Sequence, residues 1–310
     1  MIELAAPKRV LLCASTEKGL EVTNALTEAF ASRLAAVCSI EEHGVVESFH
    51  ERIWKRAAEA GVSAVEWRRF VREPIRTIDE LGIDSMLCIG WRHMVRRSVL
   101  DRLGGQVVIA HDSLLPRLRG FVPLATALIA GERETGVTFL LAADDADSGP
   151  ILWQRSVAID PTDGLADLVR KVAPLYVEGS LRWLEGSLRE ASPQNEELAS
   201  YSIWRDEEDF WIRWSESAAT IERTVRALGP PYLGARTRLA NTTVVIEAAQ
   251  VVPDLVFAVR QPGKIARLDG GKPVVICGTG LLRIEAAHAE GRSILPISRL
   301  RQRFRSPEGE

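Results

Sequence analysis

Residues 106–120 read Gln106-Val-Val-Ile-Ala-His111-Asp-Ser-Leu-Leu-Pro-Arg-Leu-Arg-Gly120. The run from Gln106 to Ala110 is short and apolar, which is typical of a buried strand. His111 follows that run directly, and Pro116 and Gly120 indicate an irregular, fixed loop between strand and helix. Because ligands bind beyond the carboxyl ends of parallel strands, the stretch predicts a functional loop at the edge of a sheet.

The sequence before this loop alternates short apolar runs with helical segments. A helical spacing of apolar residues covers 16–33, and a charged amphipathic segment, 49–60, ends at Gly61. This alternation predicts an α/β fold with a Rossmann-like, mainly parallel sheet. The earlier predicted strands are Arg9–Ser15, Leu34–Cys38, Val62–Trp67 and Ser85–Ile89.

The pattern changes after Gly136. Two β runs, 137–142 and 151–159, are joined by an acidic loop, and a long helix is predicted over 162–188. We expect a catalytic domain over 1–190, a polar linker over 191–203 and a smaller β-rich, barrel-like domain over 204–310. The last domain combines a helix, Ser217–Leu228, with short β runs at Val244–Glu247, Leu255–Val259, Gly263–Leu268, Pro273–Cys277 and Leu281–Glu285.

The composition narrows the class of protein. Hydrophobic residues make up 46% of the chain and the net charge is −3, so a packed core is expected and a nucleic-acid partner is not. No run approaches the ~20 apolar residues of a membrane helix, and the start of the chain lacks the pattern of a secretory signal. We therefore expect a cytoplasmic protein without a membrane partner. The four cysteines form no CxxC pair, which predicts buried thiols and no metal site.

Two residues are candidates for proton transfer. His111 stands at the predicted strand end, and Asp147 lies in the acidic loop just before Ser148, Gly149 and Pro150, which bend the chain. A carboxylate at such a bend can point back at the histidine, hold its ring and raise its basicity. The pair predicts a catalytic centre.

These residues also carry a resemblance to a family. His111-x-Ser-Leu-Leu-Pro-x-x-x-Gly120, Thr135-Gly-Val-Thr138, Asp147-x-Gly149 and Gln154 resemble the formyltransferases that use formyl-tetrahydrofolate. The resemblance implies formyl-tetrahydrofolate as the donor substrate and His111 and Asp147 as catalytic residues. It implies that the donor is bound by the strand end and the acidic loop, at Met86, Cys88, Gly90, Trp91, Arg92, Ala142, Asp144 and Asp145.

Three further stretches are similar to the nucleotide-sugar branch of that family: Gly90-Trp-Arg92, Arg119-Gly-Phe-Val-Pro123 and Trp204–Asp209. The tail, with Pro231-Tyr-Leu-Gly234, is similar to the C-terminal domain of several members, including the methionyl-tRNA branch. The resemblance implies an amino sugar on a nucleotide diphosphate as the acceptor. The candidate acceptor-binding residues are Ser113, Leu115, Pro116, Arg117, Arg119 and Gly120, the two arginines because guanidinium groups bind phosphate oxygens.

One position departs from the family pattern. Members carry an Asn two residues before the histidine, where it binds the carbonyl oxygen, and this chain has Ile109. Loss of one such donor costs about 10²–10³ in rate. Three alternatives stay open: another donor replaces the Asn, the chemistry changes to another one-carbon transfer or to hydrolysis of formyl-folate, or the protein only binds ligands. The sequence leaves open whether the C-terminal region binds substrate, completes the fold or forms a homodimer.

Overall fold

The computed structural model describes residues 2–307, and the chain folds into two compact units. The first unit comprises the described residues up to Pro123, together with Glu134–Ala158 and Asp167–Ile203. The second comprises Leu124–Arg133, Ile159–Ala166 and the described residues from Trp204 onward.

A seven-stranded sheet forms the centre of the first unit, in the order β4-β3-β2-β5-β6-β8-β9. The strands from β4 to β6 run parallel, whereas β8 and β9 are antiparallel to their neighbours. The predicted Rossmann-like, mainly parallel sheet is therefore confirmed. The strands are β2 (Val10–Ala14), β3 (Leu34–Ser39), β4 (Ser63–Glu66), β5 (Ser85–Ile89), β6 (Val107–His111), β8 (Glu134–Leu141) and β9 (Ile151–Ala158).

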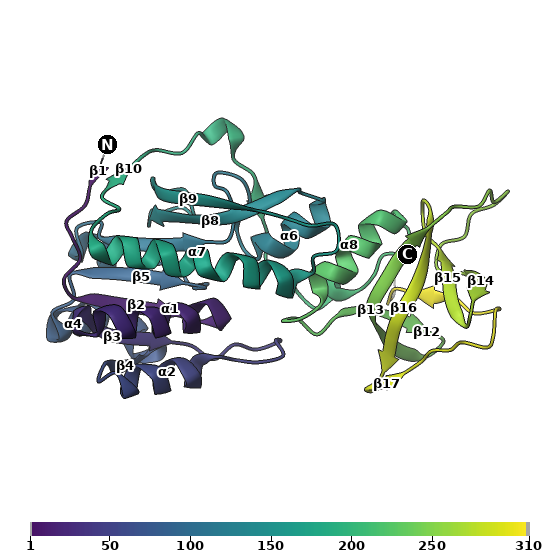
Figure 1. The fold of residues 1–310 in the computed structure, drawn as a ribbon, viewed down its shortest axis with the longest axis horizontal. Helices are drawn as coiled ribbons and strands as arrows, with labels where there is room; N and C mark the ends of the chain where they lie inside the picture. The colour runs from purple at the N-terminus through teal and green to yellow at the C-terminus, as the bar shows by residue number, and fades with distance from the viewer. Residues whose placement is uncertain (1, 308–310) are drawn as a thin grey trace. The chain divides into compact units, whose positions relative to one another are not determined.

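Helices cover both faces of this sheet, which is why β2, β3 and β5 are buried along their whole length. Helices α1, α2 and α7 lie on one face (Figure 1). On the other face, Phe70, Ile78 and Val99 from three short helices pack against β2 and β5. The helices are α1 (Thr16–Phe30), α2 (His50–Glu59), α3 (Trp67–Arg72), α4 (Pro74–Leu81), α5 (Arg97–Arg102) and α7 (Leu165–Glu185), with 3-10 turns η1 (Ala31–Arg33) and η2 (Glu196–Leu198).

The four cysteines are free and buried. Cys13 on β2 stands in register with Cys38 on β3 and with Cys88 on β5, so three thiols cross the centre of the sheet. Burial raises the pKa of the Cys13 thiol well above its usual value. These thiols therefore act as small apolar residues of the core.

The strand order reverses between β2 and β5, because the chain first builds β3 and β4 on one side and then returns to the other. In sheets of this kind ligands bind at the carboxyl ends of the strands beside such a reversal. Here the two strand ends are tied together: Ser15 N donates to Ile89 O at 3.1 Å, and Ser15 Oγ donates to Gly90 O at 2.5 Å.

The segment 191–203, predicted as a linker, is bound along the first unit. Strand β10 (Glu190–Ala191) pairs with β1 (Ile2–Glu3), and β11 (Tyr201–Ser202) pairs with β7 (Arg119–Gly120). Ser192 also exchanges hydrogen bonds with Ile151 at 2.7 and 2.9 Å. The segment therefore reaches the loop that follows His111.

The second unit holds an antiparallel sheet in the order β14-β15-β16-β13-β12-β18, with β17 beside β16, as the β-rich prediction requires. Helix α8 (Ala218–Leu228) begins at Ser217, whose Oγ accepts from Thr220 N, and it packs against β13. The other elements are α6 (Pro123–Ala130), η3 (Glu208–Phe210), β12 (Ala235–Leu239), β13 (Thr242–Val252), β14 (Ile265–Asp269), β15 (Lys272–Ile276), β16 (Leu281–Ala289), β17 (Arg292–Ser293) and β18 (Phe304–Arg305).

The predicted strand at Leu255–Val259 is wrong, because these residues form no strand. Pro253 follows the end of β13, and a proline cannot donate the hydrogen bond that would extend the sheet. Val256 is fully exposed and Val259 mostly so. Apolar side chains alone therefore did not make this run a strand.

Between residues 2 and 307, no helix is long and apolar enough to cross a membrane. Over the same range, no three His, Cys, Asp or Glu side chains are grouped so that they could hold a metal ion.

Candidate functional site

His111 is the last residue of β6 and is buried in the first unit. Its Nδ1 lies 3.5 Å from Asp147 Oδ2, which is an electrostatic contact longer than an ordinary hydrogen bond. Its Nε2 lies 2.8 Å from the carbonyl oxygen of Leu118, and since a carbonyl only accepts, Nε2 carries the proton. The structure therefore brings the predicted pair together at the carboxyl end of the sheet.

Asp147 is held in a constrained turn. Its backbone is left-handed, at φ +52°, and its Oδ2 accepts a hydrogen bond from Gly120 N at 2.8 Å. A Cβ at Gly149 would lie 1.8 Å from Leu141 O, so only glycine fits there. The strained aspartate and the required glycine fix the carboxylate beside the imidazole.

The loop after His111 is fastened from the antiparallel strands. Thr138 Oγ1 donates to Ser113 O at 2.6 Å, and Gln154 Nε2 donates to Leu115 O at 3.0 Å and to Thr138 Oγ1 at 2.7 Å. Ser113 Oγ closes the loop by donating to Arg117 O at 2.6 Å. The polar residues of the sequence motif thus serve to hold the backbone around His111.

The two predicted phosphate-binding arginines have different surroundings. Arg117 is exposed, whereas the Arg119 side chain is only 3% exposed and is bound by Glu196 and Gln194. Gln194 Nε2 in turn donates to the carbonyl oxygens of Asp147 and Gly149, at 2.8 and 2.7 Å. Sequence reasoning missed Gln194, and no local pattern marks a glutamine in a polar segment as part of a site.

A second group of charged side chains stands at the strand ends on the α1 side, and of these only Arg92, predicted to bind the donor, was identified from the sequence. Lys18 of α1 is buried and binds the Asp112 carboxylate, which accepts a hydrogen bond from Tyr176 OH at 2.7 Å. Glu42, which follows β3, binds Arg92 at 2.7 Å. Burial raises the pKa of Glu42, although Arg92 and Lys18 oppose the shift. Burial, followed by the charge of Asp112, also raises the pKa of Tyr176 well above its usual value.

Two of the predicted donor-binding residues, one on β5 and one just after it, border a cavity of about 210 Å³. Met86 and Trp91 line it, together with Trp67 and His93, whose rings stack with centroids 4.6 Å apart. Trp91 Nε1 and His93 Nε2 are buried without a hydrogen-bond partner. Burial, with the nearby Arg92, lowers the pKa of His93, so its ring is neutral at pH 7.

The other predicted donor-binding residues are spread more widely. Cys88 is buried in the sheet, and Gly90 has φ +60° where a Cβ would lie 2.7 Å from Ser15 O. Ala142 packs partly against the cluster beneath the cavity. Asp144 is exposed and binds Arg97 at 2.9 Å, and Asp145 is exposed and accepts from Ser148 through its backbone.

Ile109 lies on β6 two residues before His111, so both side chains leave the same face of the sheet. It is partly buried and packs against the cluster that contains Met86, Cys88 and Val99. At this position the strand therefore offers apolar surface instead of a hydrogen-bond donor.

Comparison with known proteins places this fold and site in one class. The formyl transferase family model matches residues 32–182, and the model of the formyl transferase C-terminal domain matches 205–305. Methionyl-tRNA formyltransferases are similar: that of Halorhodospira halophila is 34% identical over 74% of this chain and 74% of its own, and that of Syntrophus aciditrophicus is 30% identical over the same shares.

Solved structures share the fold at lower identity. The sugar 3N-formyl transferase WlaRD has a TM-score of 0.65 at 14% identity over 93% of this chain and all of its own. The N-formyltransferase of Helicobacter canadensis has 0.64 at 15%, over 89% and 98%. HypX from Aquifex aeolicus has 0.60 at 17% over 92% of this chain, which spans only 45% of HypX.

The fold and these family matches define a transferase of one-carbon groups. The chain belongs to the formyl transferase family.

Proposed function

We propose that the protein transfers the formyl group of formyl-tetrahydrofolate to the primary amine of a nucleotide-linked amino sugar. The observation that carries formyl transfer is the His111–Asp147 contact at the end of β6, on a loop held by Thr138 and Gln154. A histidine beside a fixed carboxylate can take a proton from an attacking amine and pass it on.

The donor would enter the cavity beside β5. Its apolar lining and its two unpartnered ring nitrogens, on Trp91 and His93, suit a flat heteroaromatic ring with polar edges. Two structural relatives support this choice, since WlaRD was solved with 5-N-formyl-tetrahydrofolate and HypX with tetrahydrofolic acid.

The amine would attack the formyl carbon, and the carbonyl oxygen would become an oxyanion in a tetrahedral intermediate. His111 takes the proton that the amine loses and delivers it to the departing nitrogen of the donor, while Asp147 stabilises the imidazolium. Since Nε2 carries the ring proton and donates it to Leu118 O in this structure, that proton must first move to Nδ1, beside Asp147, and Nε2 must leave Leu118 O before it can accept the proton of the amine. Ile109 contributes no hydrogen bond to the oxyanion.

The charged group on the α1 side would bind the acceptor. Lys18 and Arg92 carry the positive charge that phosphate oxygens need, and they stand where the strand order reverses. Asp112 and Glu42 are carboxylates that could accept from the acceptor's amine. The Helicobacter canadensis enzyme, solved with folinic acid and dTDP-3-aminofucose, supports an acceptor of this class.

The test uses the purified full chain with formyl-tetrahydrofolate and dTDP-, UDP- and GDP-linked amino sugars. Mass spectrometry would detect the added formyl group. We expect one class of sugar to be formylated, with the activity lost in His111→Ala and kept in His50→Ala, a histidine of α2 outside the site. Consumption of formyl-tetrahydrofolate without a formylated acceptor would show that the protein hydrolyses the donor instead of transferring its formyl group. Tight donor binding without turnover would make the protein a binding protein.

Methionyl-tRNA is the second candidate acceptor, because the similar proteins of Syntrophus aciditrophicus and Halorhodospira halophila, at 30% and 34% identity, are methionyl-tRNA formyltransferases. The outer side of β12 also carries Arg236 and Arg238, and Arg238 stands opposite Arg305 on β18. Methionyl-tRNA therefore belongs in the same panel. If it is formylated and no amino sugar is, the sugar proposal is wrong.

A further inference from the structure

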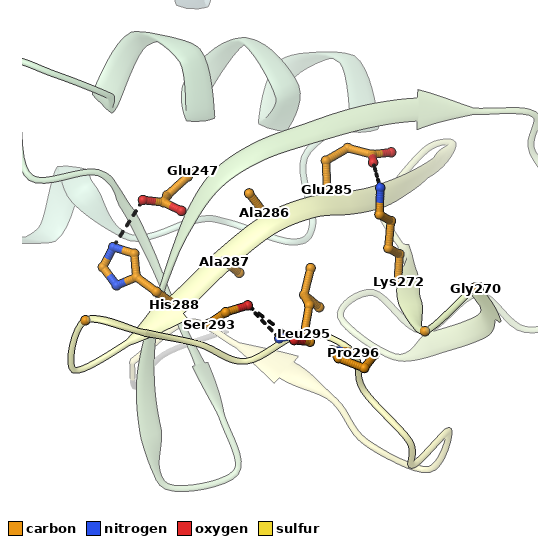
Figure 2. Close-up of a pocket in the computed structure, with 12 residues that line it drawn as sticks. Glu247, Gly270, Lys272, Glu285, Ala286, Ala287, His288, Ser293, Leu295 and Pro296 are labelled. Carbon is orange, nitrogen blue, oxygen red and sulfur yellow. Dashed lines mark hydrogen bonds and ion pairs between the residues drawn. The ribbon is translucent and has the colours of Figure 1, made fainter.

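The second unit holds a cavity of about 570 Å³ on the outer side of its sheet (Figure 2). The cavity lies over β13 and β16. It is bordered by the turns at Gly270 and Gly291 and by the segment Leu295–Pro296. Its volume falls within the range of small-molecule sites in proteins.

Two consecutive irregularities in the sheet place carboxylates in this cavity. Ile246 pairs with Ala287 and Ala248 pairs with Ala286, so Glu247 has no partner across the strand. Ala249 pairs with Ile284, so Glu285 on the opposite strand is also left out. Such bulges redirect a side chain and are frequent beside functional sites. Here each of the two neighbouring strands has one bulge, and each bulge supplies a glutamate to the same cavity.

The two glutamates differ in how their charge is balanced. Lys272 Nζ donates to Glu285 at 2.6 Å and Arg283 also binds that carboxylate, and these hydrogen bonds lower the pKa of Glu285. Among the described residues, the one ion-pair contact of Glu247 is with His288, at 3.5 Å, and the Glu247 side chain is 55% exposed. Glu247 thus presents a largely uncompensated negative charge.

At the end of the cavity that holds Lys272, positive charge exceeds negative charge. Lys272 and Arg283 together carry two positive charges against the one of Glu285, and the Lys272 side chain is 45% exposed with hydrogens to spare. Figure 2 shows the Glu247–His288 pair and the Lys272–Glu285 pair at opposite ends, with Ala286 and Ala287 between them. The small side chains leave room for a ligand to span the two ends.

We propose that this cavity binds a small zwitterion, whose ammonium group lies at Glu247 and whose phosphate or carboxylate lies at Lys272. Amino sugar phosphates and ω-amino acids share this chemistry. The site is independent of the formyl-transfer site, since all of its residues belong to the second unit.

The experiment uses the full chain labelled with ¹⁵N-glycine, because Gly270, Gly271 and Gly291 line the cavity and report on it directly. The probes are glucosamine 6-phosphate and 6-aminohexanoate, with glucosamine and glucose 6-phosphate as ligands that carry only one of the two charged groups. We expect at least one zwitterion to shift these glycine signals and to bind at least tenfold more tightly than either ligand with one charged group. A response to the sugar phosphate alone identifies a sugar site, and a response to both identifies a general zwitterion site.

Variants separate this site from binding elsewhere. Glu247→Gln and Lys272→Met should each weaken zwitterion binding at least tenfold, whereas Glu216→Gln, an exposed glutamate outside the cavity, should leave it unchanged. His111→Ala should also leave it unchanged, so failure of the formyl-transfer proposal would not affect this result. Equal binding of zwitterions and of ligands with one charged group, or no shift of the three glycine signals with either zwitterion, would overturn the proposal.

Discussion

Gln194 joins the segment 191–203 to the catalytic loop, and its removal gives a test that needs no substrate. Its Nε2 donates to the carbonyl oxygens of Asp147 and Gly149, and its Oε1 accepts from Arg119 at 2.7 and 3.1 Å. Gln194→Ala removes all of these contacts at once and leaves the turn that presents the Asp147 carboxylate to His111 without its outer support.

The magnitude follows from the kind of hydrogen bond. Each neutral hydrogen bond contributes about 1 kcal/mol, and a bond to a charged group contributes about 1.5–3 kcal/mol. Two neutral bonds to carbonyl oxygens and one guanidinium contact therefore predict a loss of about 3.5–5 kcal/mol in the free energy of unfolding. The contribution of the Gln194–Arg119 hydrogen bonds should appear as a coupling free energy of about 1.5–3 kcal/mol between the two residues.

The assay is a double-mutant cycle of Gln194→Ala and Arg119→Met, read by urea denaturation followed by circular dichroism. Asn195→Ala is the matched control: this neighbour is exposed and accepts only from Glu197 N, so a loss below about 1 kcal/mol is expected. A coupling within about 0.5 kcal/mol of zero between Gln194 and Arg119 would refute the reasoning, because the segment would then not hold the loop.

Three further outcomes are expected. Ile109→Asn should raise kcat for formyl transfer about 10²-fold and cost about 1–3 kcal/mol of stability, since it restores a donor but buries an amide; steady-state kinetics with an unchanged kcat would contradict this. The pKa of Glu42 is raised in the folded state, so the folded protein loses stability as pH rises from the unfolded-state pKa to the folded-state pKa of this carboxyl. Glu42→Gln removes this loss. Urea denaturation should therefore show a larger gain in stability over the parent at pH 7 than at pH 4. Trp91→Ala should raise the KM for formyl-tetrahydrofolate about tenfold with kcat less affected, and an unchanged KM would place the donor elsewhere.

The parts of the fold that could be predicted from sequence are those that local pattern encodes. Continuous apolar runs such as Val10–Ala14 and Ser85–Ile89 can only be strands buried on both faces, and the structure has them there. The run at Leu255–Val259 has a similar composition but no neighbouring strand to pair with, and it forms a loop. Strand formation therefore depended on a partner that the local sequence does not specify.

The residues of the candidate site also divide into those that a local sequence pattern identifies and those that only the tertiary fold brings together. His111 and Asp147 are marked by the proline and glycines around them, because those residues fix the local backbone. No local sequence pattern identifies Lys18 or Tyr176. They are separated from Asp112 by 94 and 64 positions in the sequence and contact it only in the tertiary fold. Gln194 likewise meets Asp147 across 47 residues.

Ile109, which stands where the family has Asn, also changes the apolar surroundings of the site. Ile109 packs in the same cluster as Met86 and Val99, and both of those residues line the cavity beside β5. The isoleucine therefore adds apolar surface to the cluster behind that cavity, on the same face of the sheet as His111, while it removes a hydrogen-bond donor. A drier reaction centre strengthens every charge interaction within it, including the one between Asp147 and a protonated His111. The loss of the donor and the gain in apolar surface act on the same step in opposite directions. The expected 10²-fold gain of Ile109→Asn is therefore their net effect, at the low end of the ~10²–10³ that one donor contributes.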